Sequence, residues 1–180
     1  MNRSISAAMT MAMASLATAG PAARAQAIES LRCSNAALRG DYAFTIDGQV
    51  FPPGAPVVDR RGVALTHFDG HGGLTQTDFV MQFPDKSGGS SPVPGTPNPT
   101  TGFNTGEQGH YVVFADCSGE LEIDFPPLDA GGAVIKARFV LSADGRVMHT
   151  VVYSVQPPFS PKTVPAIIRS EGRRLDLDSD

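Results

Sequence analysis

After its first 27 residues the sequence has no apolar run long enough to cross a bilayer, and no segment has the sustained periodicity of an amphipathic helix. We therefore expect no membrane span and strands in place of helices. The chain also has no glycine-rich phosphate loop followed by a helix, and no Ser, His and Asp set in a recognisable hydrolase order. These absences exclude the commonest nucleotide-binding and serine-hydrolase signatures.

The first 27 residues have the composition of a secretory signal peptide. Arg3 precedes a weakly apolar run of Ala, Met and Leu, and overlapping A-x-A cleavage patterns end at Ala25 and Ala27. The alternative is an N-terminal amphipathic helix. A signal peptide predicts a periplasmic or extracellular chain, divided into a signal over residues 1–27, one domain over 28–172 and an acidic tail over 173–180.

Positive charge is scarce in the expected mature chain. Without residues 1–27, which hold two arginines and no acid, 12 basic and 18 acidic residues remain, a net charge of −6 with neutral histidines. This balance argues against nucleic acid or an anionic membrane surface as a partner. The sequence leaves a homo-oligomer open.

Cysteine is also scarce, with Cys33 and Cys117 the two present. An even count in an exported chain indicates a disulfide, here closing a loop of about 83 residues. A redox pair is the alternative, but it would normally need closely spaced cysteines.

Most of the remaining chain alternates between apolar and polar residues, as half-buried antiparallel strands do. Two loops rich in proline and glycine interrupt the pattern, over residues 84–109 and 156–165, and the first is either flexible or laid across the mouth of a barrel. The predicted strands are eight, over residues 40–47, 62–69, 73–83, 110–116, 119–125, 133–142, 146–155 and 164–174.

Two turns repeat each other, and the first contains a dense group of ionisable residues. Asp, Gly and Leu recur with the same spacing in residues 69–74 and 116–121. We expect Asp69 to accept hydrogen bonds from the backbone of its turn, the glycine to take a positive φ, His71 to be exposed at the tip and His67 to lie in the strand. A metal site is the alternative, but it needs a third ligand from elsewhere, so we assign no metal.

Three segments together carry a resemblance to a known family: Cys33 with "ALRGDYAF" after it, "HFDGHGGL", and "YVVFADCSGEL". They resemble secreted bacterial proteins with an allene oxide cyclase barrel-like domain, which belong to the calycin-like β-barrels, over residues 33–172. The resemblance implies a single eight-stranded antiparallel up-and-down barrel with a ligand-sized interior and joined cysteines. Plant allene oxide cyclases of similar fold rearrange a fatty-acid epoxide without a cofactor, and the related dirigent proteins steer coupling of phenolic radicals. No catalytic residue can be aligned with theirs.

A barrel of eight strands is just wide enough to be filled by its own side chains or to hold one small ligand. Plain core packing is therefore the alternative for every aromatic residue that is expected to face inward. The candidate ligand-binding residues are Tyr42, Phe44, Tyr111, Phe139 and Tyr153.

The candidate catalytic residues are the ionisable groups that share a strand face with apolar residues: His149, Tyr153, His67 and Asp78. We expect the Tyr153 face of residues 146–155 to point inward, although a bulge at the preceding turn would exchange the two faces. A structural or solvent-facing histidine is the alternative for both imidazoles, and Glu171 is expected to be a charge at the rim.

Three functions agree with these observations. An exported protein that binds a small apolar or phenolic molecule needs only an apolar interior, and this is the function we favour. A cofactor-independent isomerase, cyclase or lyase acting on a lipid-like or aromatic substrate needs in addition a buried ionisable group with a shifted pKa. A structural envelope protein needs only a solid barrel.

Overall fold

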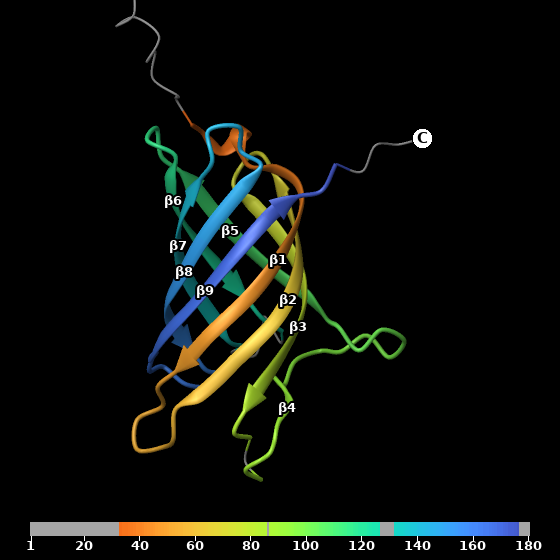
Figure 1. The fold of residues 1–180 in the computed structure, drawn as a ribbon, viewed down its shortest axis with the longest axis vertical. Coiled ribbons are helices and arrows are strands. Elements are labelled where there is room, and N and C mark those ends of the chain that lie inside the picture. The colour runs from red at the N-terminus through yellow and green to blue at the C-terminus, as the bar shows by residue number, and fades with distance from the viewer. Residues whose placement is uncertain (1–32, 86, 127–131, 177–180) are drawn as a thin grey trace, which may run out of the picture. The chain divides into compact units, whose positions relative to one another are not determined.

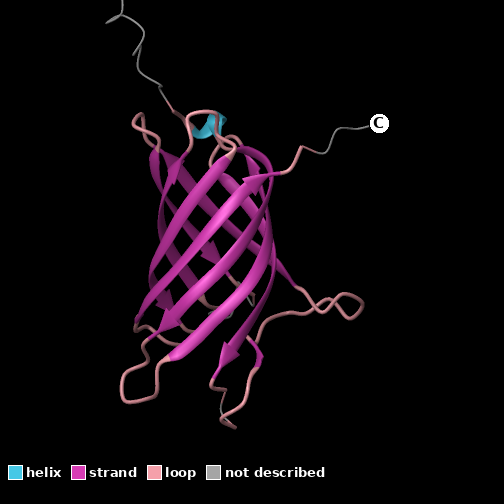
Figure 2. Cartoon of the chain, in the orientation of Figure 1, coloured by secondary structure: helices cyan, strands magenta, loops and turns pink. Residues whose placement is uncertain are grey.

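The computed structural model describes residues 33–85, 87–126 and 132–176, and these form an all-β protein (Figure 2). One short 3₁₀ helix, η2 (Asn35–Ala37), precedes the strands, and no helix of the described residues is long and apolar enough to cross a membrane. The strands are β1 (Arg39–Val50), β2 (Val58–Asp69), β3 (Gly73–Phe83), β4 (Ser91–Pro92), β5 (Asn104–Val113), β6 (Ser118–Asp124), β7 (Val134–Leu141), β8 (Val147–Gln156) and β9 (Val164–Arg174).

Eight of these strands close into one antiparallel barrel, which confirms the predicted fold class (Figure 1). Each strand pairs with its neighbour in the chain, apart from the step from β3 to β5, and β1 pairs with β9 to close the sheet. The short β4 adds to the free end of β3 through Met81 and Gln82. Closure leaves the eight barrel strands without a free edge.

Strict alternation along the strands separates an apolar interior from a charged outer wall. On β6, Leu121 and Ile123 are buried, while Glu120 and Glu122 face outward. These glutamates face basic residues of β7 across the ladder, with Glu122 Oε2 2.7 Å from the Nζ of Lys136. The period-two pattern in the sequence therefore marks the true faces of this hairpin.

One end of the barrel is solid. Leu38 and Tyr42 are fully buried there, and the Phe68 ring meets the rings of Tyr42 and Tyr111 edge to face at centroid distances of 5.3 and 5.2 Å. The Tyr111 hydroxyl donates to the carbonyl of Leu38 at 2.8 Å, so this buried phenol has a partner. The side chains at this end pack directly against one another.

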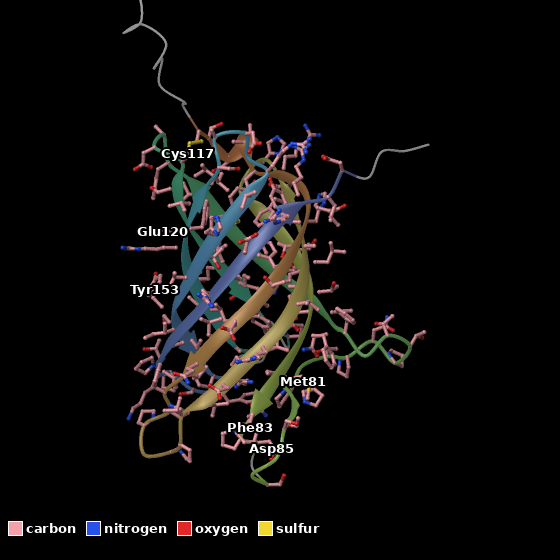
Figure 3. The ribbon with its side chains drawn as sticks, viewed as in Figure 1. Met81, Phe83, Asp85, Cys117, Glu120 and Tyr153 are labelled. Carbon is pink, nitrogen blue, oxygen red and sulfur yellow. A yellow bond between two sulfur atoms is a disulfide. The ribbon has the colours of Figure 1, made fainter. Side chains whose placement is uncertain are left out.

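The predicted disulfide is confirmed at the same end, where Cys33 is bonded to Cys117 (Figure 3). The segment before β1 is thereby joined covalently to the turn between β5 and β6. Both cysteines pack against the aromatic core.

The first of the two repeated turns has the predicted structure. Asp69 Oδ1 accepts hydrogen bonds from the backbone amides of His71, Gly72 and Gly73 at 2.7–2.9 Å, and Gly72 has a φ of +118°. His71 is exposed at the tip and His67 lies within β2. These placements confirm the turn interpretation.

The second turn differs from the prediction in one respect. Asp116 again accepts from the backbone, here from Ser118, but the positive φ of +67° belongs to Cys117 and not to Gly119. Gly119 is required for another reason, because a Cβ there would overlap the ring of Phe139. The shared glycine therefore serves conformation in one turn and packing in the other.

One segment that was predicted to be a loop contains the start of a strand. β5 begins at Asn104, inside the segment 84–109 that was predicted to be a loop. The glycines of this segment account for the error, because they suggest a loop. Gly109 instead lies where a Cβ would overlap the backbone of Glu122, so close contact between two strands requires glycine there.

Candidate ligand cavity

The half of the barrel away from the disulfide is hollow. It contains a cavity of about 370 Å³ whose wall is predominantly apolar. Loops after β1, β4 and β8 surround its open end with Pro52, Pro94 and Pro157, whereas Phe44 and Phe68 form its inner end. The volume lies at the small end of the range found for ligand pockets. Branched aliphatic side chains cover much of the wall, among them Ile46, Ile123, Ile135, Val152 and Ile168.

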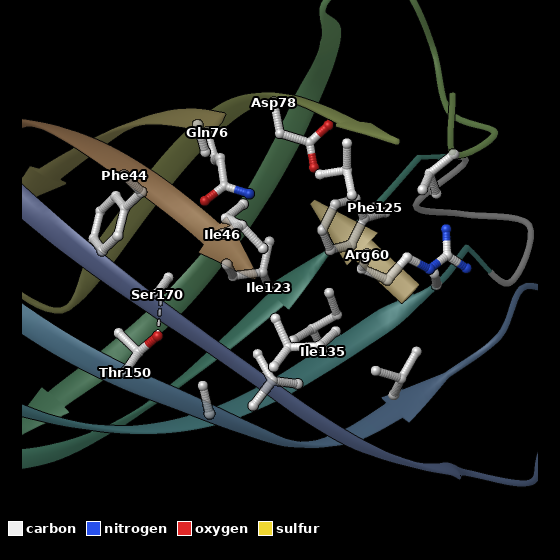
Figure 4. A pocket seen from close by; sticks show the side chains of 18 of the residues that line it. Phe44, Ile46, Arg60, Gln76, Asp78, Ile123, Phe125, Ile135, Thr150 and Ser170 are labelled. Carbon is white, nitrogen blue, oxygen red and sulfur yellow. Dashed lines mark hydrogen bonds between the residues drawn. The ribbon is translucent and has the colours of Figure 1, made fainter. Parts of the chain in front are cut away.

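A hydrogen-bonded row of polar side chains crosses this wall from β2 to β5. Thr66 Oγ1 donates to Gln76 Oε1 at 2.8 Å, and Gln76 Nε2 donates to Glu107 Oε2 at 2.9 Å. Farther along β3, Asn104 Nδ2 donates to Asp78 Oδ1 at 2.8 Å. Asp78 lines the cavity, as Figure 4 shows. A β-bulge between Gln76 and Asp78 shifts the register of β3 against β5 within this row.

Asp78 and Glu107 form a buried carboxyl pair, with 5% and 1% of their surfaces exposed. Burial, together with the nearby charge of Asp78, raises the pKa of Glu107 to about 8, while the hydrogen bond from Gln76 opposes the shift. Burial also raises the pKa of Asp78, whereas its hydrogen bonds to Asn104 and Glu107 lower it. With a pKa of about 8, Glu107 is largely protonated near neutral pH.

Arg60 of β2 is a second polar feature of the cavity, at the open end (Figure 4). Its side chain faces inward on the same strand face as Ala64 and Thr66. Burial lowers the pKa of its guanidinium, which nevertheless stays protonated at any physiological pH. Its Nη1 atom is buried and has no hydrogen-bond partner among the described residues.

Four of the five predicted ligand-binding residues face the interior, with Tyr42, Phe44, Tyr111 and Phe139 all at most 7% exposed. Their inward orientation is confirmed. Only Phe44 of this group lines the cavity, and the other three belong to the packed core near the disulfide. Plain core packing is the better account of those three.

The predicted orientation of Tyr153 and His149 is wrong, because both lie on the outer wall (Figure 3 for Tyr153). Tyr153 is 48% exposed with the Arg138 guanidinium 5.7 Å from its ring centroid. The turn before β8 sets Met148 opposite the inward Leu141, and Met148 is fully buried. Once Met148 points inward, alternation directs His149 outward. Neither side chain faces the cavity, so neither can act on a molecule bound there.

Of the remaining ionisable candidates, Asp78 reaches the cavity and His67 does not. His67 lies on the outer face of β2 with Nδ1 2.8 Å from Asp41 Oδ1. Glu171, expected at the rim, lies near the end of β9 and accepts from Arg173 Nε at 2.8 Å. Across residues 33–85, 87–126 and 132–176 no group of three or more His, Cys, Asp or Glu side chains is placed to hold a metal ion.

The sequence analysis missed Glu107 and Arg60. Glu107 was assigned to a loop, although Glu107, Gly109, Tyr111 and Val113 continue one alternating face of β5. Arg60 is followed by Arg61, and two adjacent arginines suggest a solvated segment. Extending the alternation of Ala64 and Thr66 backward along β2 would have directed Arg60 inward.

No known family model matches this chain. No curated protein matches it significantly either.

Proposed function

We propose that this protein is exported and that it binds a small apolar or phenolic molecule inside its barrel. The observation that carries the proposal is the open cavity of about 370 Å³, which is apolar but bordered by a few hydrogen-bonding groups. A predominantly apolar wall with a few placed polar groups is the usual composition of a small-molecule site. The disulfide is compatible with folding in an oxidising compartment.

The shape of the interior supports binding over a purely structural role. A structural barrel needs no space inside, yet here the packed aromatic core fills only the end near the disulfide. Water molecules in an apolar cavity find few hydrogen-bond partners on its wall. The hydrophobic effect therefore favours a ligand that covers this wall. The resemblance to allene oxide cyclase barrel-like proteins, whose plant counterparts act on apolar substrates, supports the same proposal.

Titration calorimetry with 1-naphthol, a small phenolic probe, tests this function. We expect saturable binding of one molecule per chain, with a negative heat-capacity change because apolar surface is buried. Ala137→Leu and Ala64→Leu, which add volume on different parts of the wall, should each weaken binding about tenfold or more, because the larger side chain occupies space that the ligand needs.

Val151→Leu is the matched control, because Val151 is 50% exposed on the outer wall of β8. It should leave the affinity unchanged. Circular dichroism would verify that each variant is folded. Equal binding by folded wild-type protein and both filled variants would refute an interior site.

The buried carboxyl pair supports a second candidate function, a cofactor-independent isomerase or cyclase. Asp78 reaches the cavity and, in its ionised form, can accept a proton from a bound substrate. Glu107, buried beside it, holds a proton near neutral pH and can return one through Asp78 to another atom of the same molecule. The proton count balances, and such a rearrangement needs no redox partner.

For this second function we expect Asp78→Asn to abolish turnover of a cognate substrate, by about a hundredfold or more, because the proton acceptor is lost. Tyr153→Phe on the outer wall should retain full turnover. The measurement is proton–deuterium exchange of candidate substrates in D₂O, followed by NMR. Exchange that persists in Asp78→Asn would exclude the carboxyl pair as the base.

A further inference from the structure

The charge on Arg60 is not neutralised by the protein within the described residues. No carboxylate of those residues lies within ion-pair distance of its guanidinium, and its buried Nη1 atom has no hydrogen-bond partner. The neighbouring Arg61 behaves differently, since its Nε lies 3.2 Å from Asp47 Oδ1 on the outer wall. A buried guanidinium nitrogen without a partner is costly, which favours a ligand that supplies one.

The two polar features of the cavity lie at different depths. In the register of β2 with β3, Ala64 is opposite Asp78 and Arg60 is opposite Gln82. Four residues along a strand separate the two levels by about 13 Å between Cα atoms. No ion pair joins the two side chains in the described part of the chain, and the positions midway between them on β2 and β3 are Gly62 and Val80.

We propose, resting on the binding function above, that the ligand is a small monocarboxylate whose anionic group binds Arg60 at the open end of the barrel. The guanidinium presents parallel N–H donors that match the two oxygens of a carboxylate. The apolar body extends inward toward Phe44, where Ile123, Val152 and Ile168 cover it.

The charge distribution fixes the orientation of such a ligand. A carboxylate at the inner level would lie against the buried carboxyl group of Asp78, whereas at the open end it meets the positive charge of Arg60. The volume corresponds to roughly a dozen water-sized groups, which suits an aromatic or medium-chain aliphatic acid. A larger amphiphile would extend through the opening between the proline-containing loops.

The test compares 1-naphthoate with neutral 1-naphthol by calorimetry at neutral pH. We expect the wild type to bind naphthoate about 10- to 100-fold more tightly, the range given by a charge-assisted hydrogen bond. Arg60→Gln should remove this preference while naphthol binding persists, and Arg60→Lys should keep part of it. Arg61→Gln is the matched control, because Arg61 points away from the cavity, and it should keep the full preference.

The outcomes separate this inference from the binding function. Equal affinity of the wild type for naphthoate and naphthol, or a preference that survives Arg60→Gln, overturns the role of Arg60 but leaves an interior site for neutral molecules. Failure of both probes to bind overturns the binding function itself. The comparison of wild type with Arg60→Lys decides the question even where Arg60→Gln does not fold.

Discussion

Cys117→Ser is expected to lower the free energy of unfolding by about 4 kcal/mol in the chain-entropy account of disulfides. The bond joins residues 84 positions apart and therefore constrains a large part of the unfolded chain. It also fixes the segment that places Leu38 and η2 over the aromatic core. The measurement is urea unfolding of oxidised wild type and variant, followed by circular dichroism.

Reduced wild-type protein is the matched reference, because it loses the bond without a change of sequence. It should unfold at nearly the same urea concentration as Cys117→Ser. Ser118→Ala in the same turn removes one exposed hydrogen bond to Asp116 and should cost far less. A variant as stable as the oxidised wild type would show that packing alone holds the closed end.

Glu107→Gln is expected to make the protein more stable at neutral and alkaline pH. The folded-state pKa of Glu107 is about 8, above the ordinary value of 4.5, so folding favours its protonated form. Its contribution to stability is fully present below about pH 4.5 and is lost as the pH rises through about 8. Wild-type stability should thus fall between about pH 5 and pH 8.5, by about 3 kcal/mol after allowance for relaxation around the buried charge.

Glutamine keeps a donor and an acceptor at this position and has no proton to lose. Urea unfolding across this pH range should therefore give a much flatter profile for Glu107→Gln, with the two proteins diverging as the pH rises. Glu120→Gln, which changes a glutamate on the outer wall, should reproduce the wild-type slope. The pKa values of the turn aspartates Asp69 and Asp116 are lowered, so these groups change the stability only in more acidic solution, outside the pH range compared. Parallel profiles for wild type and Glu107→Gln would contradict a buried, protonated Glu107.

The sequence predicts most strands because their two faces differ clearly in polarity. Leu121 and Ile123 alternate with glutamates, and only one orientation of β6 buries the apolar set. On β3 the same reasoning placed Asp78 on one face with Leu74, and both are buried, whereas Phe83, expected on the core face, is 54% exposed. The structure of the first turn could also be predicted from the sequence, because Asp69 and the backbone amides that it accepts from lie within a few residues of each other.

The remaining errors arise where neither face of a strand is clearly polar, or where two residues that interact are far apart in the sequence. On β8, Val151 and Tyr153 rival Met148 and Val152 in apolarity, so only the tertiary register decides which face is inside. The carboxyl pair requires β3 and β5 to be neighbours across a long insertion, and that pairing has no local signal.

The central claim, that a ligand occupies the barrel interior, is tested most directly by intermolecular NOEs between bound 1-naphthol and assigned methyl groups. We predict NOEs to Ile46, Val152 and Ile168, which line the cavity, and none to Val140 and Val151, which are 52% and 50% exposed on the outer wall. NOEs to the outer methyl groups alone would place the ligand outside the barrel and contradict the account, as would a saturated complex that shows no NOE to the cavity methyl groups.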